Sequence, residues 1–196
     1  MSVLSEMDAP VFAAEGMPEI ENPEQWKMRV AGMAGKEVEV NLSDLKVLPN
    51  CSVNCRLTSV SGWSVRADWN GVLWREFIKA YPPKPGAAHV TFRSAGGYTT
   101  TVPLSALDHP RVLLCWGVGG EPIEVEYGGP LRMVIPNLWG YKSCKWLMEV
   151  TYTDLMIPGY WESRGYTDHG RIEPGHTMDV NTRTRRPIKG GEVIDF

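Results

Sequence analysis

The sequence contains no long run of apolar residues and no excess of positive charge. None of its hydrophobic stretches approaches the ~20 residues that a membrane-spanning helix needs, so we expect no membrane span. The 20 Lys and Arg residues are outnumbered by 23 Asp and Glu, which gives a formal net charge of −3. Nucleic-acid-binding proteins usually carry a basic face, so we expect no nucleic-acid partner. A local basic pocket for a small anion remains compatible with this charge.

Cysteine is scarce, and its spacing does not suit a metal site. Of the four cysteines, Cys51 and Cys55 are four residues apart and no second pair follows, which is not a zinc-knuckle spacing. Buried, reduced thiols in a cytosolic protein explain this pattern better than a disulfide or a metal site. The four histidines are scattered without ligand spacing, and no haem motif of the Cys-x-x-Cys-His type occurs.

The first 24 residues lack the positively charged n-region of a secretory signal peptide, which favours a cytoplasmic protein. Residues 1–24 are acidic and contain proline, so we predict a surface arm. A single domain is expected over residues 25–170. Residues 171–196 are predicted to be a polar tail that packs on this domain, and an anion-binding arm is the less favoured alternative.

Short β-prone segments outnumber helical ones, and no regular alternation of strands and helices is visible. Helices are expected from an N-cap at Ser43 and over residues 73–81. A hairpin is expected over residues 89–102, around the turn at 95–97. The pattern therefore predicts an α+β fold with a mixed β-sheet and few short helices. Further strands are predicted over residues 26–33, 38–42, 56–61, 112–117, 131–136 and 146–152.

The segment from Gly128 to Trp146 contains the densest functional signal. Its paired glycines allow a close approach of the backbone, and Arg132 offers a planar fork suited to phosphate. The run 142–145 places two lysines, a hydroxyl and backbone amides in one short loop, which can cradle an anion. From composition alone, a strand–loop–strand with surface lysines explains the segment equally well.

Several blocks in this order resemble the sulfite oxidase family. Gly-Gly-Pro-Leu-Arg at 128–132 and Gly-Tyr-Lys-Ser-x-Lys-Trp at 140–146 are similar to its pterin-binding signature. Gly62-Trp63-Ser64 is similar to the segment that follows the family's metal ligand. Similar blocks at 92–104, 113–123 and 158–166 extend the resemblance over about residues 25–170. It implies the sulfite-oxidase-type molybdopterin-binding fold and favours the cradle interpretation.

The resemblance also implies a cofactor and a reaction. The family holds one molybdenum through a pterin dithiolene and one protein thiolate, and it transfers an oxygen atom together with two electrons. We therefore expect Mo-molybdopterin, a small-molecule substrate (an oxyanion or a sulfoxide) and an external electron carrier. By position in the motifs, the residues expected to contact the cofactor are Ser94, Tyr127, Arg132, Lys142, Ser143, Cys144 and Lys145.

Two positions depart from the family pattern. Ser59 occupies the position of the thiolate ligand, so the predicted metal ligand and catalytic residue is a serine, a harder oxygen donor. Cys55 lies four residues upstream, which along a strand is about 13 Å away at roughly 3.3 Å per residue, so it should not replace the ligand. Tyr127 stands where relatives usually have His or Asn, and its bulk would narrow the pocket.

Three functions stay open at this stage. The first is a molybdopterin-dependent oxidoreductase, the second a cofactor-binding protein with lost or altered turnover, and the third a remnant with an empty pocket. Ser59 favours the second and third, whereas the phosphate loop argues against the third. Arg56 and Arg66 flank Ser59 and could attract an oxyanion, or they could be ordinary exposed charges. The Asp168–His169 pair with Arg164 could border a substrate mouth or belong to a solvated loop.

Overall fold

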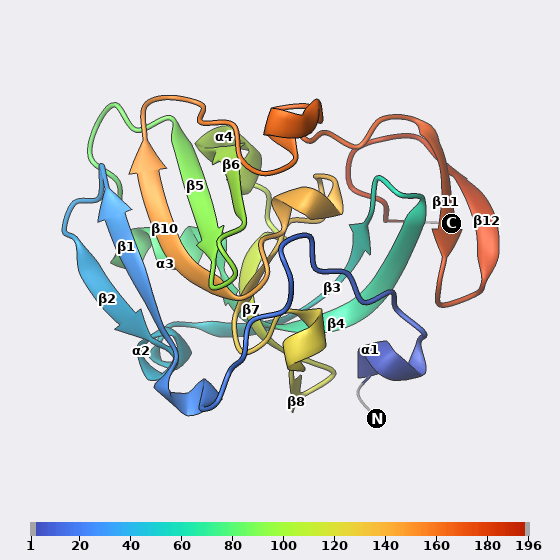
Figure 1. Cartoon of the computed structure of the whole chain (residues 1–196), viewed down its shortest axis with the longest axis horizontal. Helices are drawn as coiled ribbons and strands as arrows, with labels where there is room; N and C mark the ends of the chain where they lie inside the picture. The colour runs from blue at the N-terminus through green and yellow to red at the C-terminus, as the bar shows by residue number, and fades with distance from the viewer. Residues whose placement is uncertain (1–2, 195–196) are drawn as a thin grey trace.

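The computed structural model describes residues 3–194 and contains two β-sheets joined at their edges by loops and short helices (Figure 1). The first sheet stands on the left of Figure 1, and the second runs across the bottom to the right. No helix within residues 3–194 is long and apolar enough to cross a bilayer.

The first sheet has the strand order β2-β1-β10-β5-β6. Strand β1 pairs in parallel with β10, and the other neighbours are antiparallel. Alternation of exposed and buried residues along β1 explains why this segment forms a strand, with Met28 and Val30 facing the core. The strands are β1 (Lys27–Gly32), β2 (Val38–Asn41), β5 (His89–Ser94), β6 (Thr99–Pro103) and β10 (Leu147–Thr153).

The second sheet is built around the long strand β4, which pairs with β3, β7 and β11. Its β4–β11 pairing is parallel, so both sheets are mixed, as predicted. The strands are β3 (Asn50–Thr58), β4 (Trp63–Leu73), β7 (Leu113–Val118), β8 (Glu121–Pro122), β9 (Arg132–Val134), β11 (Gly175–Asp179) and β12 (Thr184–Ile188).

Helices are few and short within the described residues, which confirms the α+β class. The helix expected from an N-cap at Ser43 begins two residues earlier, because Asn41 is the N-cap and its amide donates to the Asp44 carboxylate at 2.8 Å, so Ser43 lies inside the helix. The α-helices are α1 (Val3–Glu6), α2 (Leu42–Val47), α3 (Trp74–Ala80) and α4 (Leu104–Leu107), and the 3-10 helices are η1 (Pro23–Gln25), η2 (Val125–Tyr127), η3 (Gly140–Lys142) and η4 (Glu162–Arg164).

The largest hydrophobic core lies under the first sheet. Trp74 on α3 packs against Phe77, Phe92 and Tyr152, with ring centroids 5.2–6.3 Å apart. A second core around the fully buried Trp69 lies against the second sheet. The two cores hold the loops between the sheets in fixed positions.

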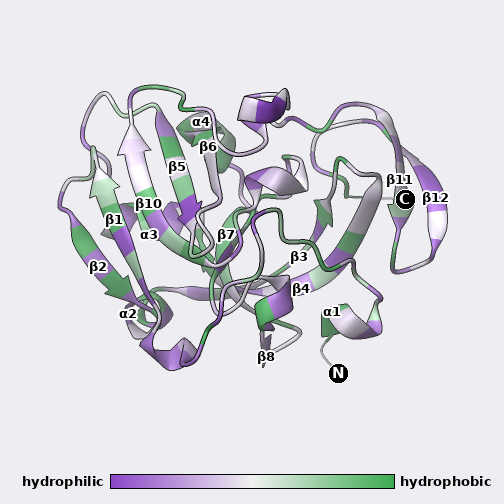
Figure 2. Cartoon of the chain, viewed as in Figure 1, coloured by the Kyte–Doolittle hydropathy of each residue, from purple (hydrophilic) through white to green (hydrophobic). Residues whose placement is uncertain are grey.

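Both predicted terminal segments are more ordered than an arm and a tail. The N-terminal segment begins with α1 and then crosses the face of the molecule between the two sheets (Figure 1). Its apolar stretch, residues 9–14, lies over the middle of the molecule (Figure 2). The C-terminal segment forms the hairpin β11–β12, which extends the second sheet beside β4. The tail thus packs on the domain by main-chain pairing.

Candidate functional site

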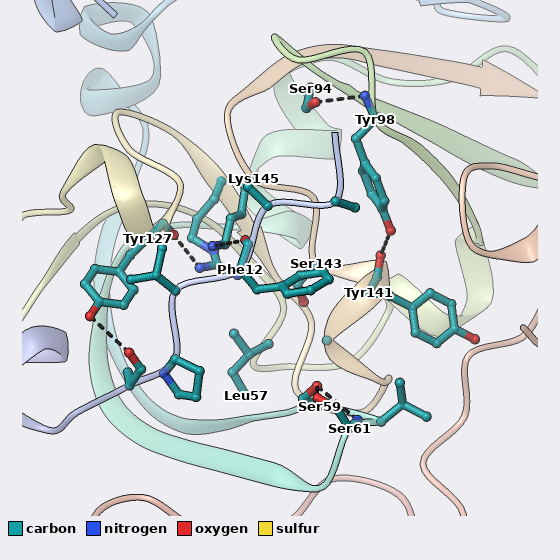
Figure 3. Close-up of a pocket in the computed structure, with 18 of the residues that line it drawn as sticks. Phe12, Leu57, Ser59, Ser61, Ser94, Tyr98, Tyr127, Tyr141, Ser143 and Lys145 are labelled. Atoms are coloured by element: carbon teal, nitrogen blue, oxygen red, sulfur yellow. Dashed lines mark hydrogen bonds between the residues drawn. The ribbon is translucent and has the colours of Figure 1, made fainter. Parts of the chain in front are cut away.

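A cavity of about 600 Å³ opens where the two sheets meet. Its size lies in the range of cofactor and ligand pockets. The walls come from the N-terminal segment, the β3–β4 turn, the end of η2, the start of β9, η3 and the residues on either side of η4 (Figure 3). Six of the eight predicted site residues line it: Ser59, Ser94, Tyr127, Arg132, Ser143 and Lys145.

Arg132 begins β9 at the inner end of the cavity and is only 3% exposed. Its Nε donates to the carbonyl of Met133 at 3.2 Å, and Nη1 donates to the carbonyl of Tyr127. The guanidinium also lies 5.7 Å from the centroid of the Trp69 ring. Burial lowers the pKa of Arg132 to about 10. This cation is therefore hydrogen-bonded, but no carboxylate among residues 3–194 pairs with it.

Lys145 lines the same part of the cavity and is partly buried. Its Nζ donates to the carbonyls of Phe12 at 2.7 Å and Glu126 at 3.0 Å. Burial, followed by repulsion from Arg132, lowers the pKa of Lys145 to about 7. Within residues 3–194 neither cation forms an ion pair with a carboxylate. Two uncompensated cations in one cavity are suited to an anionic ligand.

The backbone of the η2–β9 loop lies close to Lys145 at Gly128, a position that has no side chain. Gly128 has φ +104, a left-handed conformation that L side chains rarely adopt. A Cβ at this position would also lie 2.8 Å from Cγ of Lys145. The paired glycines are therefore needed to bring the η2–β9 loop and the lysine together, as the sequence predicted.

The remaining polar residues at this end are held by main-chain contacts. Ser143 Oγ accepts a hydrogen bond from the Ile135 amide at 3.0 Å. Ser94 Oγ accepts one from the Tyr98 amide at 3.1 Å. Tyr127, the departure from the family pattern, donates its hydroxyl to the carbonyl of Ala9 at 3.1 Å. It thereby anchors the N-terminal segment beside the cavity.

Ser59 lies in the turn between β3 and β4, on another wall of the cavity (Figure 3). Its Oγ is 2.7 Å from Ser61 Oγ and accepts from the Ser61 amide at 3.2 Å. The turn packs against η3, because a Cβ on Gly140 would lie 3.7 Å from Cα of Ser59. Residue 59 and the phosphate-loop cations therefore face one cavity, as the sequence interpretation requires.

Two predicted contact residues do not line the cavity. Lys142 is fully buried, and its ammonium donates to the Thr101 carbonyl at 2.8 Å and pairs with Glu162. It joins η3 to η4, so its side chain is not a cofactor contact in this structure. The Cys144 thiol is also buried away from the cavity, and burial raises its pKa. Cys55 likewise lies in the second core.

The sequence analysis missed the contribution of the N-terminal segment. Residues 9–16 line the cavity, and the Phe12 ring lies between Lys145 and Ser59 in Figure 3. An apolar run, Pro10 to Ala14, inside an otherwise acidic arm was the available signal. Trp161 and Tyr166 were also missed as wall residues. They lie near the end of the resembling blocks, in a segment interpreted only as closing the domain.

Comparison with known proteins identifies the family. Residues 14–161, more than half of the chain, match the family described as the oxidoreductase molybdopterin binding domain. The chain belongs to this family, which includes the sulfite oxidases and the sulfoxide reductases resembling them.

Individual relatives agree with this assignment. The chain is 33% identical to an uncharacterised oxidoreductase of Bacillus subtilis, YuiH, over 84% of its own length and 83% of that protein. It is 27% identical to the protein-methionine-sulfoxide reductase catalytic subunit MsrP of Xanthomonas axonopodis, over 74% of this chain and 50% of that protein. The chain thus spans most of the first relative but about half of the second.

A solved structure shows the same fold. The sulfane dehydrogenase SoxCD of Paracoccus pantotrophus superposes with a TM-score of 0.68 at 16% identity, covering 90% of this chain and 47% of that one. The expected sulfite-oxidase-type fold is therefore confirmed.

The cavity offers different groups to the phosphate end and to the metal end of molybdopterin. Arg132 and Lys145 are uncompensated cations and suit the phosphate end of the cofactor. The opposite wall offers the hydroxyls of Ser59 and Ser61, and within residues 3–194 no cysteine lines the cavity. The cations thus suit the pterin-phosphate half, whereas the wall around residue 59 offers oxygen donors and no thiol.

Proposed function

We propose that this chain binds Mo-molybdopterin in the cavity and acts as an oxidoreductase that transfers an oxygen atom to or from a small molecule. One observation carries the proposal: two cations without carboxylate partners and Ser59 line the same cavity. An anionic ligand would replace carbonyl contacts of Arg132 and Lys145 with charge-assisted hydrogen bonds.

The proposed roles follow from the contacts. Arg132 and Lys145 would bind the phosphate, and the Ser143 hydroxyl could donate to it while still accepting from the Ile135 amide. Ser94 and Tyr127 would border the pterin from two sides. Lys142 would act indirectly, by fixing η3 against η4 through Glu162.

Ser59 is proposed as the protein ligand of the metal. When bound, the molybdenum centre supplies two-electron oxygen-atom chemistry. Ser61 donates its amide to Ser59 Oγ, and such a bond favours the ionised form of an oxygen donor. The Ser61 amide would thus stabilise the negative charge that the Ser59 oxygen carries only when it is bound to the metal.

A second candidate is a cofactor-binding protein with lost or altered turnover. It is favoured by Ser59 itself, because a serine replaces the thiolate and every described cysteine lies outside the cavity. Both candidates keep the phosphate contacts and differ only at the metal end.

An electron carrier and a cytoplasmic location complete the proposal. Oxygen-atom transfer moves two electrons, and we propose that an external carrier supplies or removes them. The four free cysteines suit a reducing compartment. Fractionation of cells that produce the protein would test the location.

The test measures molybdenum and pterin in purified protein from a host that makes the cofactor. We expect close to one of each per chain, and loss of both in Arg132→Met but not in Arg93→Met, an exposed arginine on β5. Pterin without metal supports the binding-protein alternative, and absence of both overturns the proposal. Ser59→Cys then asks whether turnover appears or rises on loaded protein.

A further inference from the structure

The wall beside Ser59 is built from aromatic rings. Tyr141 on η3 packs edge-on against Tyr166, with centroids 5.2 Å apart. Tyr166 stacks on Trp161 at 4.8 Å, and Trp161 faces Phe12 at 6.2 Å. These four rings, the aromatic wall, run from the turn that holds Ser59 to the N-terminal segment.

Lys145 and Arg132 are the cations among residues 3–194 that line the cavity, and both lie at the end where we place the phosphate. The aromatic wall beside Ser59 therefore has no cation among these residues. The arginines that could have attracted an oxyanion are bound elsewhere. Arg56 forms a buried ion pair with Asp179 at 2.9 Å. Arg66 donates to the carbonyl of Ile194, and Arg164 lies over the Tyr160 ring at 3.6 Å.

This arrangement discriminates between substrates by charge. An inorganic oxyanion placed beside Ser59 would lose hydration and gain no cationic partner, which is unfavourable. A neutral compound with a polar S–O or N–O bond loses far less hydration. Its hydrocarbon part can also pack against the exposed ring of Tyr166, which Trp161 supports from behind.

We propose that the substrate of this site is a neutral organic oxo compound with a flat ring, an aryl sulfoxide or a heteroaromatic N-oxide, and not an inorganic oxyanion. This inference rests on the proposed function. In the reducing direction the S–O or N–O bond breaks, and sulfur or nitrogen gains two electrons from an external reductant such as a reduced viologen. The oxygen leaves as water with two protons.

The test measures binding directly on protein whose molybdenum and pterin content is known. Equilibrium dialysis compares methyl phenyl sulfoxide, pyridine N-oxide, dimethyl sulfoxide and sulfite. We expect both ring compounds to bind about tenfold more tightly than dimethyl sulfoxide, because ring stacking adds to apolar burial. Sulfite should bind most weakly, and equal or tighter binding of sulfite overturns the proposal.

Variants of the aromatic wall sharpen the test. Trp161→Ala should weaken the ring compounds about tenfold, whereas Trp161→Phe keeps a ring and most of the affinity. Tyr166 is partly exposed, so a polar residue is tolerated there. Tyr166→Arg should improve sulfite binding about tenfold through a charged hydrogen bond, and Tyr166→Gln should not. Unchanged ring binding in Trp161→Ala, or unchanged sulfite binding in Tyr166→Arg, contradicts the inference.

The two proposals fail in different ways. Protein without pterin and molybdenum overturns the proposed function and, with it, the substrate assignment. Loaded protein that prefers sulfite overturns only the substrate assignment. Loaded protein that binds both ring compounds but never reduces them supports the specificity of the site and the binding-protein alternative.

Discussion

Lys142 and Lys145 lie three residues apart in one loop, yet their surroundings are opposite. Lys142 is fully buried against Glu162, a matched pair of charges without solvent contact. Lys145 faces the cavity and donates only to two carbonyl groups. Both have lowered pKa values, chiefly because of burial, but the Glu162 carboxylate opposes the effect at Lys142 and Arg132 adds to it at Lys145.

The comparison separates Lys142, a structural cation, from Lys145, the cation that we propose to bind the ligand. A buried charge with an internal partner is satisfied before any ligand binds. A charge without one is tolerated where a ligand supplies the missing partner. The sequence motif treats the two lysines alike, and only their partners separate them. Four predictions test this distinction.

The largest expected effect is on stability at the paired lysine. Lys142→Met leaves the Glu162 carboxylate buried alone and should lower the free energy of unfolding by about 3–5 kcal/mol. Urea unfolding of the unloaded protein measures this change. The double variant Lys142→Met/Glu162→Leu should recover most of the loss, since no lone charge remains. A single variant as stable as the parent would contradict the structural role.

The same substitution at the unpaired lysine should act on the ligand. Lys145→Met should leave the unfolding free energy of the unloaded protein within about 1 kcal/mol or raise it, because it removes a charge without a partner. Pterin retained after dialysis should fall about tenfold, which corresponds to loss of one charged hydrogen bond. Normal retention in Lys145→Met would remove this residue from the phosphate site.

The sequence predicted the site better than it predicted the roles within it. The resemblance to the sulfite oxidase family implied that Ser59, Arg132 and Lys145 belong to one site, and the three residues do line one cavity. It could not separate Lys142 from Lys145, since the Glu162 partner comes from another loop 20 residues away.

Long-range packing explains the other differences from the sequence-based expectations. Strands with a clear local pattern, such as β1 and β5, were predicted near their observed positions. The central strand β4 was not predicted, because Asn70 and Gly71 within it are typical turn residues. The N-terminal segment was expected only at the surface, but Ala9 and Phe12 accept hydrogen bonds from residues more than 100 positions away. The C-terminal hairpin was expected to be a tail. In the structure it pairs with β4, and this pairing brings together Met178 and Trp63, which are distant in the sequence. Neither contact leaves a local sequence signal.

A smaller effect concerns pH. The pKa of Lys145 is about 7 in the folded protein and its ordinary value is 10.5, so the unfolded chain holds a proton that the folded one lacks between these values. Stability of the unloaded protein should therefore rise with pH over this window, by at most about 1.4 kcal/mol per pH unit and less because the ammonium is partly exposed. Urea unfolding at several pH values measures the slope, and Lys145→Met should flatten it. Inorganic phosphate should bind more tightly below pH 7.

The smallest effect is expected at a third kind of cation, one that is paired but solvated. Arg183, in the β11–β12 turn, pairs with Asp8 of the N-terminal segment, and both side chains are largely exposed. Asp8→Asn should change the unfolding free energy by less than about 1 kcal/mol, and salt should mask even that. Retained pterin should not change, because the segment is held at the cavity by the contacts of Ala9 and Phe12 with Tyr127 and Lys145. Loss of pterin in Asp8→Asn would instead mean that this exposed ion pair is needed for ligand binding. A cation with a carboxylate partner could then no longer be classed as purely structural.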